Sequence, residues 1–333
     1  MEYRRLGESG VKVSVIALGA MNFGLNPDKS WIGPGLNEED SVAITRYAFD
    51  QGVNFIDTAD LYGHGVSEEY VGKAIEPFRD EIVLATKLNA QMGPGPNDGG
   101  LSAFHMVRAC EASLRRLRTD RIDLYQLHTQ RFDVPHEEVL EALDRLVRDG
   151  KVIYVGCSNY AAWMIAEARG ICARRDLAQF VSVQPRYNLI ARDIERDVLA
   201  VSERYGLGVL PWSPLAAGLL SGKYHRGEPP TEGRWSVYPY NERFSEITDQ
   251  QWNTVEAVVS IAEARGVEAA QVACAWLLSR RAVSSVLGGA NSLEQMKTYI
   301  GAAEVKLTGE ETAQLDEVSR SEFNPPWPPQ LVV

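Results

Sequence analysis

The sequence has few cysteines and lacks any long apolar segment. Its 333 residues include four cysteines, which lie far apart and form no C-x-x-C pair. A zinc site and a disulfide framework are therefore not expected. The N-terminus carries no apolar signal segment, and no stretch of about 18 uninterrupted apolar residues occurs. We therefore expect a cytoplasmic protein without a membrane-spanning segment.

An excess of basic residues is also lacking. Asp and Glu total 45 against 34 Lys and Arg, which gives a net charge of −11. Phosphate contacts need clustered Lys and Arg, so neither nucleic acid nor an anionic membrane is expected as a partner. With 45% hydrophobic and 24% charged residues, the composition suits a soluble globular protein with a large core. No G-x-G-x-x-G follows a predicted strand, which disfavours a Rossmann-type dehydrogenase.

The sequence does contain a regular alternation of apolar strands and helices. The predicted strands begin near residues 15, 53, 82, 122, 152, 180, 208 and 284. From the second to the seventh, their spacing of roughly 30 residues is the length of a βα unit. Eight such units predict a (β/α)8 barrel, with an open doubly wound sheet as the alternative.

The other predicted elements fit around these strands. Tyr3–Leu6 and Val11–Ser14 flank a glycine-containing turn and predict a hairpin ahead of the barrel. One domain is expected to span residues 1–333, with long loops at about 88–101 and 216–249 over the barrel mouth. Asn37 is expected to cap a helix, and the other predicted helices are Ser67–Ile75, Ser102–Leu117, His136–Arg148, Ala161–Ala173, Asp193–Tyr205, Gln251–Arg265, Glu268–Leu278 and Leu293–Ala302.

Polar residues recur where the predicted strands end. Those that follow an apolar strand are Asp57, Lys87, His128, Ser158, Asn159, Gln184 and Ser213. Active sites of such barrels lie at the C-terminal ends of the strands, so these side chains are expected to share one mouth. Taken singly, an Asp after a strand is usually a cap or loop residue, and a His is more often hydrogen-bonded within the structure than catalytic. The repetition favours a site.

Asp57 and Lys87, with His128 as a neighbour, can together adjust the acidity of a proton donor, the Tyr62 phenol. The reference pKa of tyrosine is about 10, too high for easy proton exchange at neutral pH. An ammonium at Lys87 would stabilise the Tyr62 phenolate, and Asp57 would keep that ammonium charged. His128 would add a hydrogen-bond donor, so the set suits a carbonyl oxygen. A proton donor beside a carbonyl needs a hydride source, which no side chain supplies, so a nicotinamide cofactor is expected.

A Schiff-base lyase with Lys87 as nucleophile is a competing hypothesis on the same barrel. It requires a neutral amine. Asp57 beside Lys87 would keep the amine protonated, which disfavours this alternative.

The motifs resemble a known family. Asp57 and Tyr62 in Asn54–Gly63, Lys87 at the end of the third strand and His128 at the end of the fourth are similar to the tetrad of the aldo-keto reductases. Other similar segments are Gly156–Tyr160, Gln184 with Tyr187 and Asn188, and Trp212–Tyr224. The likeness runs from the first hairpin to about residue 303. Within it, Gly-Leu-Leu-Ser-Gly-Lys-Tyr resembles the branch that includes aflatoxin-aldehyde-type reductases and potassium-channel β subunits.

This resemblance implies roles for individual residues. Tyr62 would be the general acid, with its pKa lowered by Lys87 and Asp57, and His128 would orient the substrate carbonyl. The nicotinamide carboxamide would be held by Ser158, Asn159 and Gln184, with Trp212 stacked on the ring. Ser213, Leu215, Gly218 and Lys223 would line the pyrophosphate, and Gly288, Gly289, Ala290, Asn291, Ser292 and Gln295 the adenosine phosphate end. Gly19, Met21, Pro214 and Asp57 complete the implied cofactor set.

The implied cofactor is NADP(H), with NAD(H) as an alternative. Family members often carry Glu-Asn where this chain has Thr298-Tyr299. Gln295 stands where some members have an Arg for the 2′-phosphate. These departures leave the choice between the two cofactors open.

The resemblance predicts an enzyme that reduces a small-molecule aldehyde or ketone. A cofactor-loaded regulatory subunit with little turnover, like the channel β subunits, is the alternative. Met21, Trp31, the loop near Gly93 and the aromatics around Tyr224 and Trp235 are candidates for the substrate pocket. The oligomeric state is left open by the sequence.

Overall fold

The computed structural model describes residues 1–24 and 35–320, so Trp31 lies outside the described residues. Its first strands, β1 (Tyr3–Arg5) and β2 (Lys12–Ser14), form an antiparallel hairpin. The strands that follow are β3 (Ile16–Gly19), β4 (Phe55–Asp57), β5 (Val83–Leu88), β6 (Ile122–Leu127), β7 (Val152–Ser158), β8 (Phe180–Gln184), β9 (Gly208–Val209) and β10 (Val286–Gly288).

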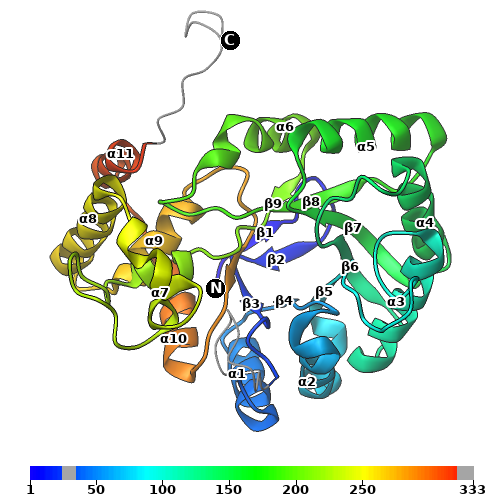
Figure 1. Cartoon of the computed structure of the whole chain (residues 1–333), viewed down its shortest axis with the longest axis horizontal. Coiled ribbons are helices and arrows are strands. Elements are labelled where there is room, and N and C mark those ends of the chain that lie inside the picture. The colour runs from blue at the N-terminus through cyan, green and yellow to red at the C-terminus, as the bar shows by residue number, and fades with distance from the viewer. Residues whose placement is uncertain (25–34, 321–333) are drawn as a thin grey trace, which may run out of the picture.

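Helices alternate with these strands and surround them (Figure 1). They are α1 (Glu38–Asp50), α2 (Val66–Ile75), α3 (Ala103–Leu117), α4 (His136–Arg148), α5 (Ala162–Arg175), α6 (Val198–Tyr205), α7 (Tyr240–Arg243), α8 (Asp249–Arg265), α9 (Ala269–Leu278), α10 (Leu293–Gly301) and α11 (Gly309–Val318). As predicted, Asn37 caps α1, and its side chain accepts a hydrogen bond from Asp40 N at 2.9 Å. In residues 1–24 and 35–320, no helix combines the length and apolar character that crossing a membrane requires.

The parallel strands close into a barrel. Within the described residues, eight strands form one sheet in the order β10-β3-β4-β5-β6-β7-β8-β9. A parallel bridge between Val209 and Val283 joins the two ends, and Val209 N donates to Ala282 O at 2.9 Å. The predicted (β/α)8 barrel is therefore confirmed, and the closed ring excludes the open doubly wound sheet.

Alternation along the strands separates two cores. The inner-facing cluster, which fills the barrel, contains Leu6, Val13, Ala17, Phe55, Val83, Ala85, Leu124, Leu210 and Leu287. Outward side chains such as Leu84, Tyr125 and Val155 belong to the larger core shared with the helices. Because successive residues face opposite sides, Asp57 and Lys87 point inward at the ends of β4 and β5.

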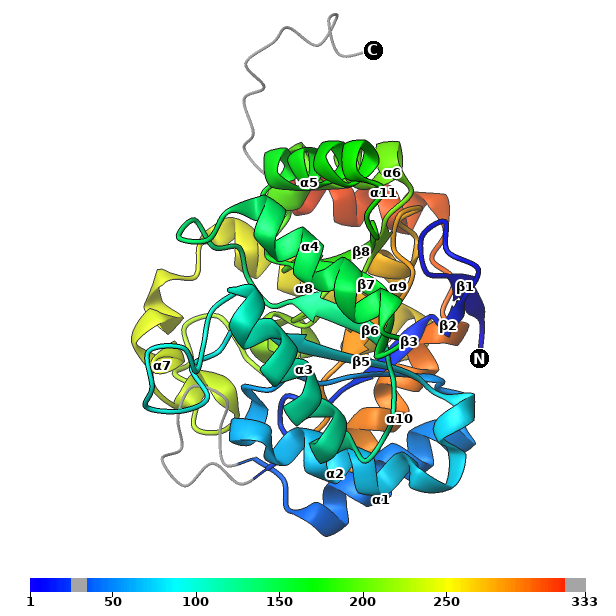
Figure 2. The same cartoon turned by 90° about the vertical axis from the view of Figure 1, so that its right-hand side faces the viewer.

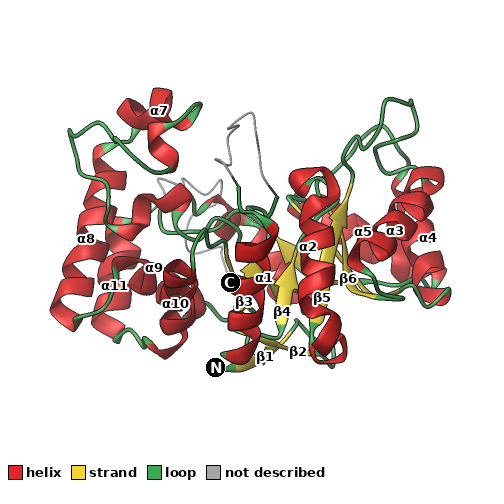
Figure 3. Cartoon of the chain, turned by 90° about the horizontal axis from the view of Figure 1, so that it is seen from below, coloured by secondary structure: helices red, strands yellow, loops and turns green. Residues whose placement is uncertain are grey.

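The hairpin closes one end of the barrel. Figures 2 and 3 show β1 and β2 at that end and α7 at the opposite one. Glu8 N donates to Gly206 O at 2.8 Å, and Gly7 has a φ of +59°. A Cβ at Gly7 would lie 2.4 Å from Gly206 O, so only glycine fits this contact. With this end sealed, the other end is left for the site.

The predicted loop at 216–249 is held together by its own aromatic residues. Trp235 packs edge-on against Tyr240 and Phe244, with ring centroids 5.2 and 6.0 Å apart. Its indole Nε1 donates to Ala216 O at 3.3 Å. Short 3₁₀ turns and α7 interrupt the segment. Trp235 and Tyr224, expected as pocket residues, thus also form the packing centre of this segment.

One predicted helix is split in the structure, and helices α7 and α11 were not predicted. The expected helix Asp193–Tyr205 is split, because its first turn is a 3₁₀ turn at Asp193–Arg196 and Asp197 has a non-helical φ of −148°. Glu195 accepts from Tyr187 Oη at 2.6 Å and from Arg192, which holds this turn off the axis of α6.

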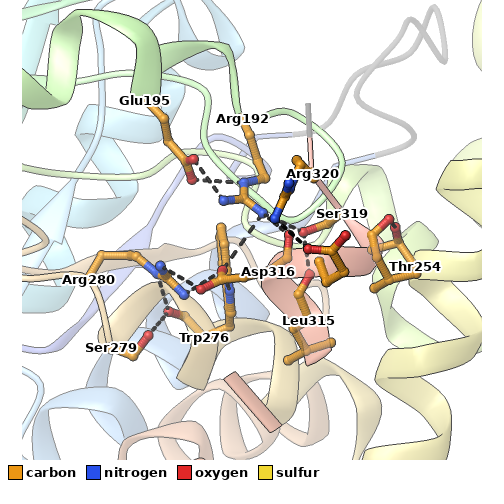
Figure 4. A network of polar contacts seen from close by, with 12 residues as sticks. Arg192, Glu195, Thr254, Trp276, Ser279, Arg280, Leu315, Asp316, Ser319 and Arg320 are labelled. Carbon is orange, nitrogen blue, oxygen red and sulfur yellow. Dashed lines mark hydrogen bonds and ion pairs between the residues drawn. The ribbon is translucent and has the colours of Figure 1, made fainter. Parts of the chain in front are cut away.

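Helix α11 is fixed to α9 by a polar network around Trp276 (Figure 4). Asp316 accepts from Trp276 Nε1 at 2.9 Å and from Arg280 Nη2 at 2.8 Å. The guanidinium carbons of Arg280 and Arg192 lie 4.4 and 5.2 Å from the Trp276 ring. The network therefore joins α9, α11 and the turn after β8.

We expect Asp316→Ala to lower the free energy of unfolding by about 1–2 kcal/mol, because it leaves the buried Trp276 N–H without its acceptor. Urea denaturation of the full chain measures this. Glu317→Ala is the matched control, since its side chain is 70% exposed and pairs only at the surface with Arg320. Equal effects of the two variants would contradict a stabilising role of the network.

Candidate active site

Four polar side chains meet at the open end of the barrel. Lys87 Nζ donates to Asp57 Oδ2 at 2.5 Å, to Thr58 O at 2.9 Å and to Tyr62 Oη at 3.2 Å. The Tyr62 and His128 rings lie edge to face, with centroids 5.6 Å apart. The barrel register produces this meeting, because Asp57 lies opposite Ala85 and Lys87 opposite Gln126. The four residues predicted as a tetrad are thus close together.

Asp57 also accepts hydrogen bonds from two glutamines. Gln184 Nε2 and Gln126 Nε2 lie 2.9 and 3.0 Å from Asp57 Oδ1. Gln126 was not among the residues predicted from the sequence. Its signal was present, since it is a polar residue within the apolar strand β6, two positions before His128. These bonds fix the carboxylate that faces Lys87.

Charge interactions keep Lys87 protonated. Burial is the largest influence on Lys87 and lowers its pKa, but the charges and hydrogen bonds of Asp57 and Tyr62 together outweigh burial, so the net pKa is raised above the usual value. A neutral amine is therefore disfavoured at neutral pH. The geometry argues against the Schiff-base alternative.

Lys87 lowers the pKa of Tyr62 as expected, but Asp57 raises it and the net pKa lies above the usual value. Burial raises the pKa of the half-buried Tyr62 phenol, and the Lys87 ammonium opposes this only in part. The phenol is therefore protonated throughout the neutral range, as a proton donor must be. Lys87 reduces the cost of losing that proton.

His128 is neutral in this environment. Burial and then the charge of Lys87 lower the pKa of His128 to about 3. The backbone carbonyl of His128 accepts from Asn159 Nδ2 at 3.1 Å, and its N–H donates to Leu88 O at 3.0 Å. These bonds fix the backbone at His128, and a neutral imidazole there can donate a hydrogen bond to a carbonyl.

The residues expected around the nicotinamide carboxamide lie side by side. Ser158 Oγ donates to Gln184 O at 2.8 Å and accepts from Asn159 Nδ2 at 3.0 Å. Trp212 Nε1 donates to Asn159 Oδ1 at 3.0 Å. Asn159 and Ser213 both have a φ of 55°, which is rare for residues other than glycine. Such strained residues gather at functional sites.

The segment expected at the pyrophosphate follows β9. Asn188 Nδ2 donates to Ser213 O at 2.8 Å, and Pro214 is buried beneath the turn. Leu215 is half-buried and precedes a 3₁₀ turn. Gly218 has a φ of +93°, and a Cβ there would lie 3.3 Å from Lys223 Cε. The cation of Lys223 therefore lies beside a glycine turn, which suits a phosphate.

The residues expected at the adenosine end lie at β10 and the start of α10. Ser292 caps this helix by accepting from Gln295 N at 3.2 Å, and Gln295 Oε1 accepts from Asn291 N at 2.8 Å. A Cβ at Gly288 would lie 2.8 Å from Tyr299 Cγ, so this glycine makes room for a core ring. Gly289 and Ala290 connect the strand to the helix.

The remaining expected cofactor residues border the same region. Gly19 lies at the end of β3, opposite Asp57, and a Cβ there would lie 3.6 Å from Gly288 O. Met21 follows it and is half-buried. Gly19 and Met21 thus lie between the tetrad and the adenosine-end residues along the ring of strands.

The described residues offer little for metal or thiol chemistry. Within residues 1–24 and 35–320, no group of three or more His, Cys, Asp or Glu could hold a metal ion. Burial raises the pKa of Cys110 and Cys274 to about 12, far from a reactive thiolate.

Comparison with known proteins agrees with the motifs. The sequence profile of the Aldo/keto reductase family matches residues 15–320. The chain is 37% identical over 312 residues to a probable voltage-gated potassium channel subunit beta of Arabidopsis thaliana, with 92% of each chain covered. It is 35% identical over 337 residues to versiconal hemiacetal acetate reductase of Aspergillus parasiticus, covering 95% of this chain and 96% of that enzyme. The chain therefore belongs to the aldo-keto reductase family.

Proposed function

We propose that this oxidoreductase reduces aldehydes or ketones to alcohols, with NADPH as hydride donor and Tyr62 as general acid. The observation that carries the proposal is the chain Asp57–Lys87–Tyr62 beside a neutral His128. A relative named versiconal hemiacetal acetate reductase supports the reaction class.

The proton transfer follows from the contacts of Tyr62. The phenol donates its proton to the carbonyl oxygen as negative charge develops there. Lys87 Nζ, 3.2 Å from Tyr62 Oη, stabilises the phenolate that remains. Asp57 balances the charge of Lys87, and His128 donates a hydrogen bond that orients the carbonyl.

A nicotinamide cofactor supplies the hydride when bound. The residues present fit such a group. Asn159 and Gln184 offer amide groups that match a carboxamide, and the strained backbone at Asn159 and Ser213 presents polar atoms at the mouth. Lys223 and the N-terminus of α10 suit phosphate. NADPH rests on the family likeness, and fluorescence titrations with NADPH and with NADH measure the preference at Gln295.

The protonation states predict that His128 and Tyr62 do not make kcat/KM fall as the pH is lowered from neutral to about 5. Because the pKa of His128 is about 3 and that of Tyr62 is raised, neither group changes charge between about pH 5 and 8. We expect kcat/KM for an aldehyde to show no ionisation of His128 near pH 6.5. A limb near that pH that disappears in His128→Gln would contradict the neutral imidazole.

A regulatory subunit is the second candidate, because two relatives are named as probable potassium channel β subunits. Steady-state NADPH oxidation with a panel of aldehydes separates the two candidates. Turnover well above the rate without aldehyde supports the reductase. Tight NADPH binding with no aldehyde-dependent oxidation across the panel favours the regulatory subunit.

A further inference from the structure

A cavity lies between α3, the loop at 89–101 and the segment after β4. Its volume is about 460 Å³. Asp60 lines it from the segment after β4, and Met92, Gly93 and Asp98 line it from the loop. Helix α3 contributes His105, Arg108, Ala109, Glu111, Ala112, Arg115 and Arg116. The Gly/Pro loop singled out in the sequence thus borders this cavity.

Two buried polar side chains that line it are not fully hydrogen-bonded. Asp60 is 1% exposed, and within the described residues its carboxylate accepts no regular hydrogen bond, although the backbone N–H groups of Leu61 and Asn89 lie close enough to stabilise its charge. His105 is 4% exposed, and its Nε2 is also unpaired there, while a hydrogen bond with the backbone of Asn97 holds the ring. Buried acceptors without donors are costly, so a ligand that donates to both would be stabilised.

Charge is divided between the floor of the cavity, at Asp60 and His105, and its exposed rim, at Arg108 and Arg115. Arg116 Nε donates to Glu68 Oε2 at 2.6 Å, so Arg116 is largely balanced by Glu68 and offsets the charge of Asp60 only in part. At the exposed rim, Arg108 pairs with Asp98 only at 3.4 Å. Arg115 forms no ion pair within 4.0 Å in residues 1–24 and 35–320, and its neighbour Glu111 is paired with Lys151 at 2.8 Å. The floor therefore favours a cation and the rim an anion.

We propose that this cavity is a binding site for a small dipolar molecule. Its ammonium group donates hydrogen bonds to Asp60 and His105, and its acidic group binds Arg108 and Arg115. This site is separate from the proposed reduction and does not depend on it.

Binding is expected to depend on pH. Burial, followed by the charge of Glu68, raises the pKa of Asp60 to about 7. The groups that face Asp60 are Glu68 of α2, Arg116 of α3, Tyr125 of β6 and Tyr62. Because the ammonium pairs best with the ionised carboxylate, affinity should rise as pH increases through about 7, with release of a proton.

Calorimetric titration of the full chain at pH above 7 tests the site. The probes are glycine, β-alanine and γ-aminobutyrate, which separate the two charges by increasing lengths, with butylamine and butyrate as single-charge controls. We expect one dipolar probe to bind at least about tenfold more tightly than either control, as one additional charged contact provides. Absence of saturable binding by every dipolar probe through the millimolar range would overturn the proposal.

Variants assign the contacts. Asp60→Asn should weaken the dipolar probe and butylamine about tenfold but leave butyrate unchanged. Arg115→Ala should weaken the dipolar probe and butyrate, whereas Arg118→Ala, in the αL cap after α3 and outside the cavity, should not. His105→Phe, a second variant, removes the Nε2 acceptor and places a larger ring in the cavity. It should abolish the heat of binding of the dipolar probe. Affinity unchanged in both Asp60→Asn and His105→Phe, with folding verified by circular dichroism, would refute the site. Because heat is measured without turnover, failure here is distinct from failure of the reductase.

Discussion

Replacing Tyr62 by Phe is expected to lower kcat for aldehyde reduction by about 10³-fold, within the range that general acid catalysis provides. The change removes a single oxygen, the one that Lys87 Nζ approaches at 3.2 Å. Everything else in the tetrad is retained. Steady-state NADPH oxidation at saturating aldehyde measures the loss.

Two controls separate chemistry from folding. Tyr154→Phe removes a phenol oxygen from β7, away from the tetrad, and should change kcat by less than about twofold. The dissociation constant of NADPH, from quenching of tryptophan fluorescence, should be similar in Tyr62→Phe and the unmodified protein. Turnover that survives Tyr62→Phe unchanged would remove Tyr62 from the acid role.

The buried ion pair Asp57–Lys87 should produce the largest loss of stability. The side chains of Lys87 and Asp57 are 0% and 3% exposed. Asp57→Asn keeps the shape but leaves the Lys87 ammonium without its counterion, which typically costs about 3–5 kcal/mol. Lys87→Met should cost less, because Gln126 and Gln184 still donate to Asp57 Oδ1.

The double variant Asp57→Asn/Lys87→Met distinguishes stability from activity. Since it removes both charges, its free energy of unfolding should return to within about 1–2 kcal/mol of the unmodified protein. Its kcat should stay about 10²-fold low or lower, because no ammonium stabilises the phenolate. If the losses of the single variants simply added in the double variant, the two groups would not act as a pair.

The barrel was predictable because its signals are local and repeated. The apolar runs from the second to the seventh strand mark βα units by their spacing of roughly 30 residues, and with the first and last runs they make the eight that a closed barrel needs. The polar residues at the strand ends could be selected for the same reason, since each directly follows its strand. Gly288 shows the limit of this reasoning, because the ring of Tyr299 packs where its Cβ would be.

Features that depend on contacts between distant segments could not be predicted from the sequence. Gln126 matters because it reaches Asp57, 69 residues earlier in the chain. The split of the predicted helix at Asp197 depends on the contacts of Glu195 with Tyr187 and Arg192. The sign of the Tyr62 pKa shift depends on burial by the whole fold. Helix α11 did have a local signal, the capping box of Thr308 and Glu311.

Deuterium transfer is the most direct test of the proposed reaction. NADPH labelled at the hydride position of the nicotinamide is incubated with the full chain and an aldehyde that supports turnover, and the alcohol is examined by mass spectrometry. We expect one deuterium on the former carbonyl carbon, with formation of labelled alcohol falling about 10³-fold in Tyr62→Phe. Alcohol without deuterium, or labelled alcohol formed equally fast by Tyr62→Phe, would contradict hydride transfer with Tyr62 as the acid.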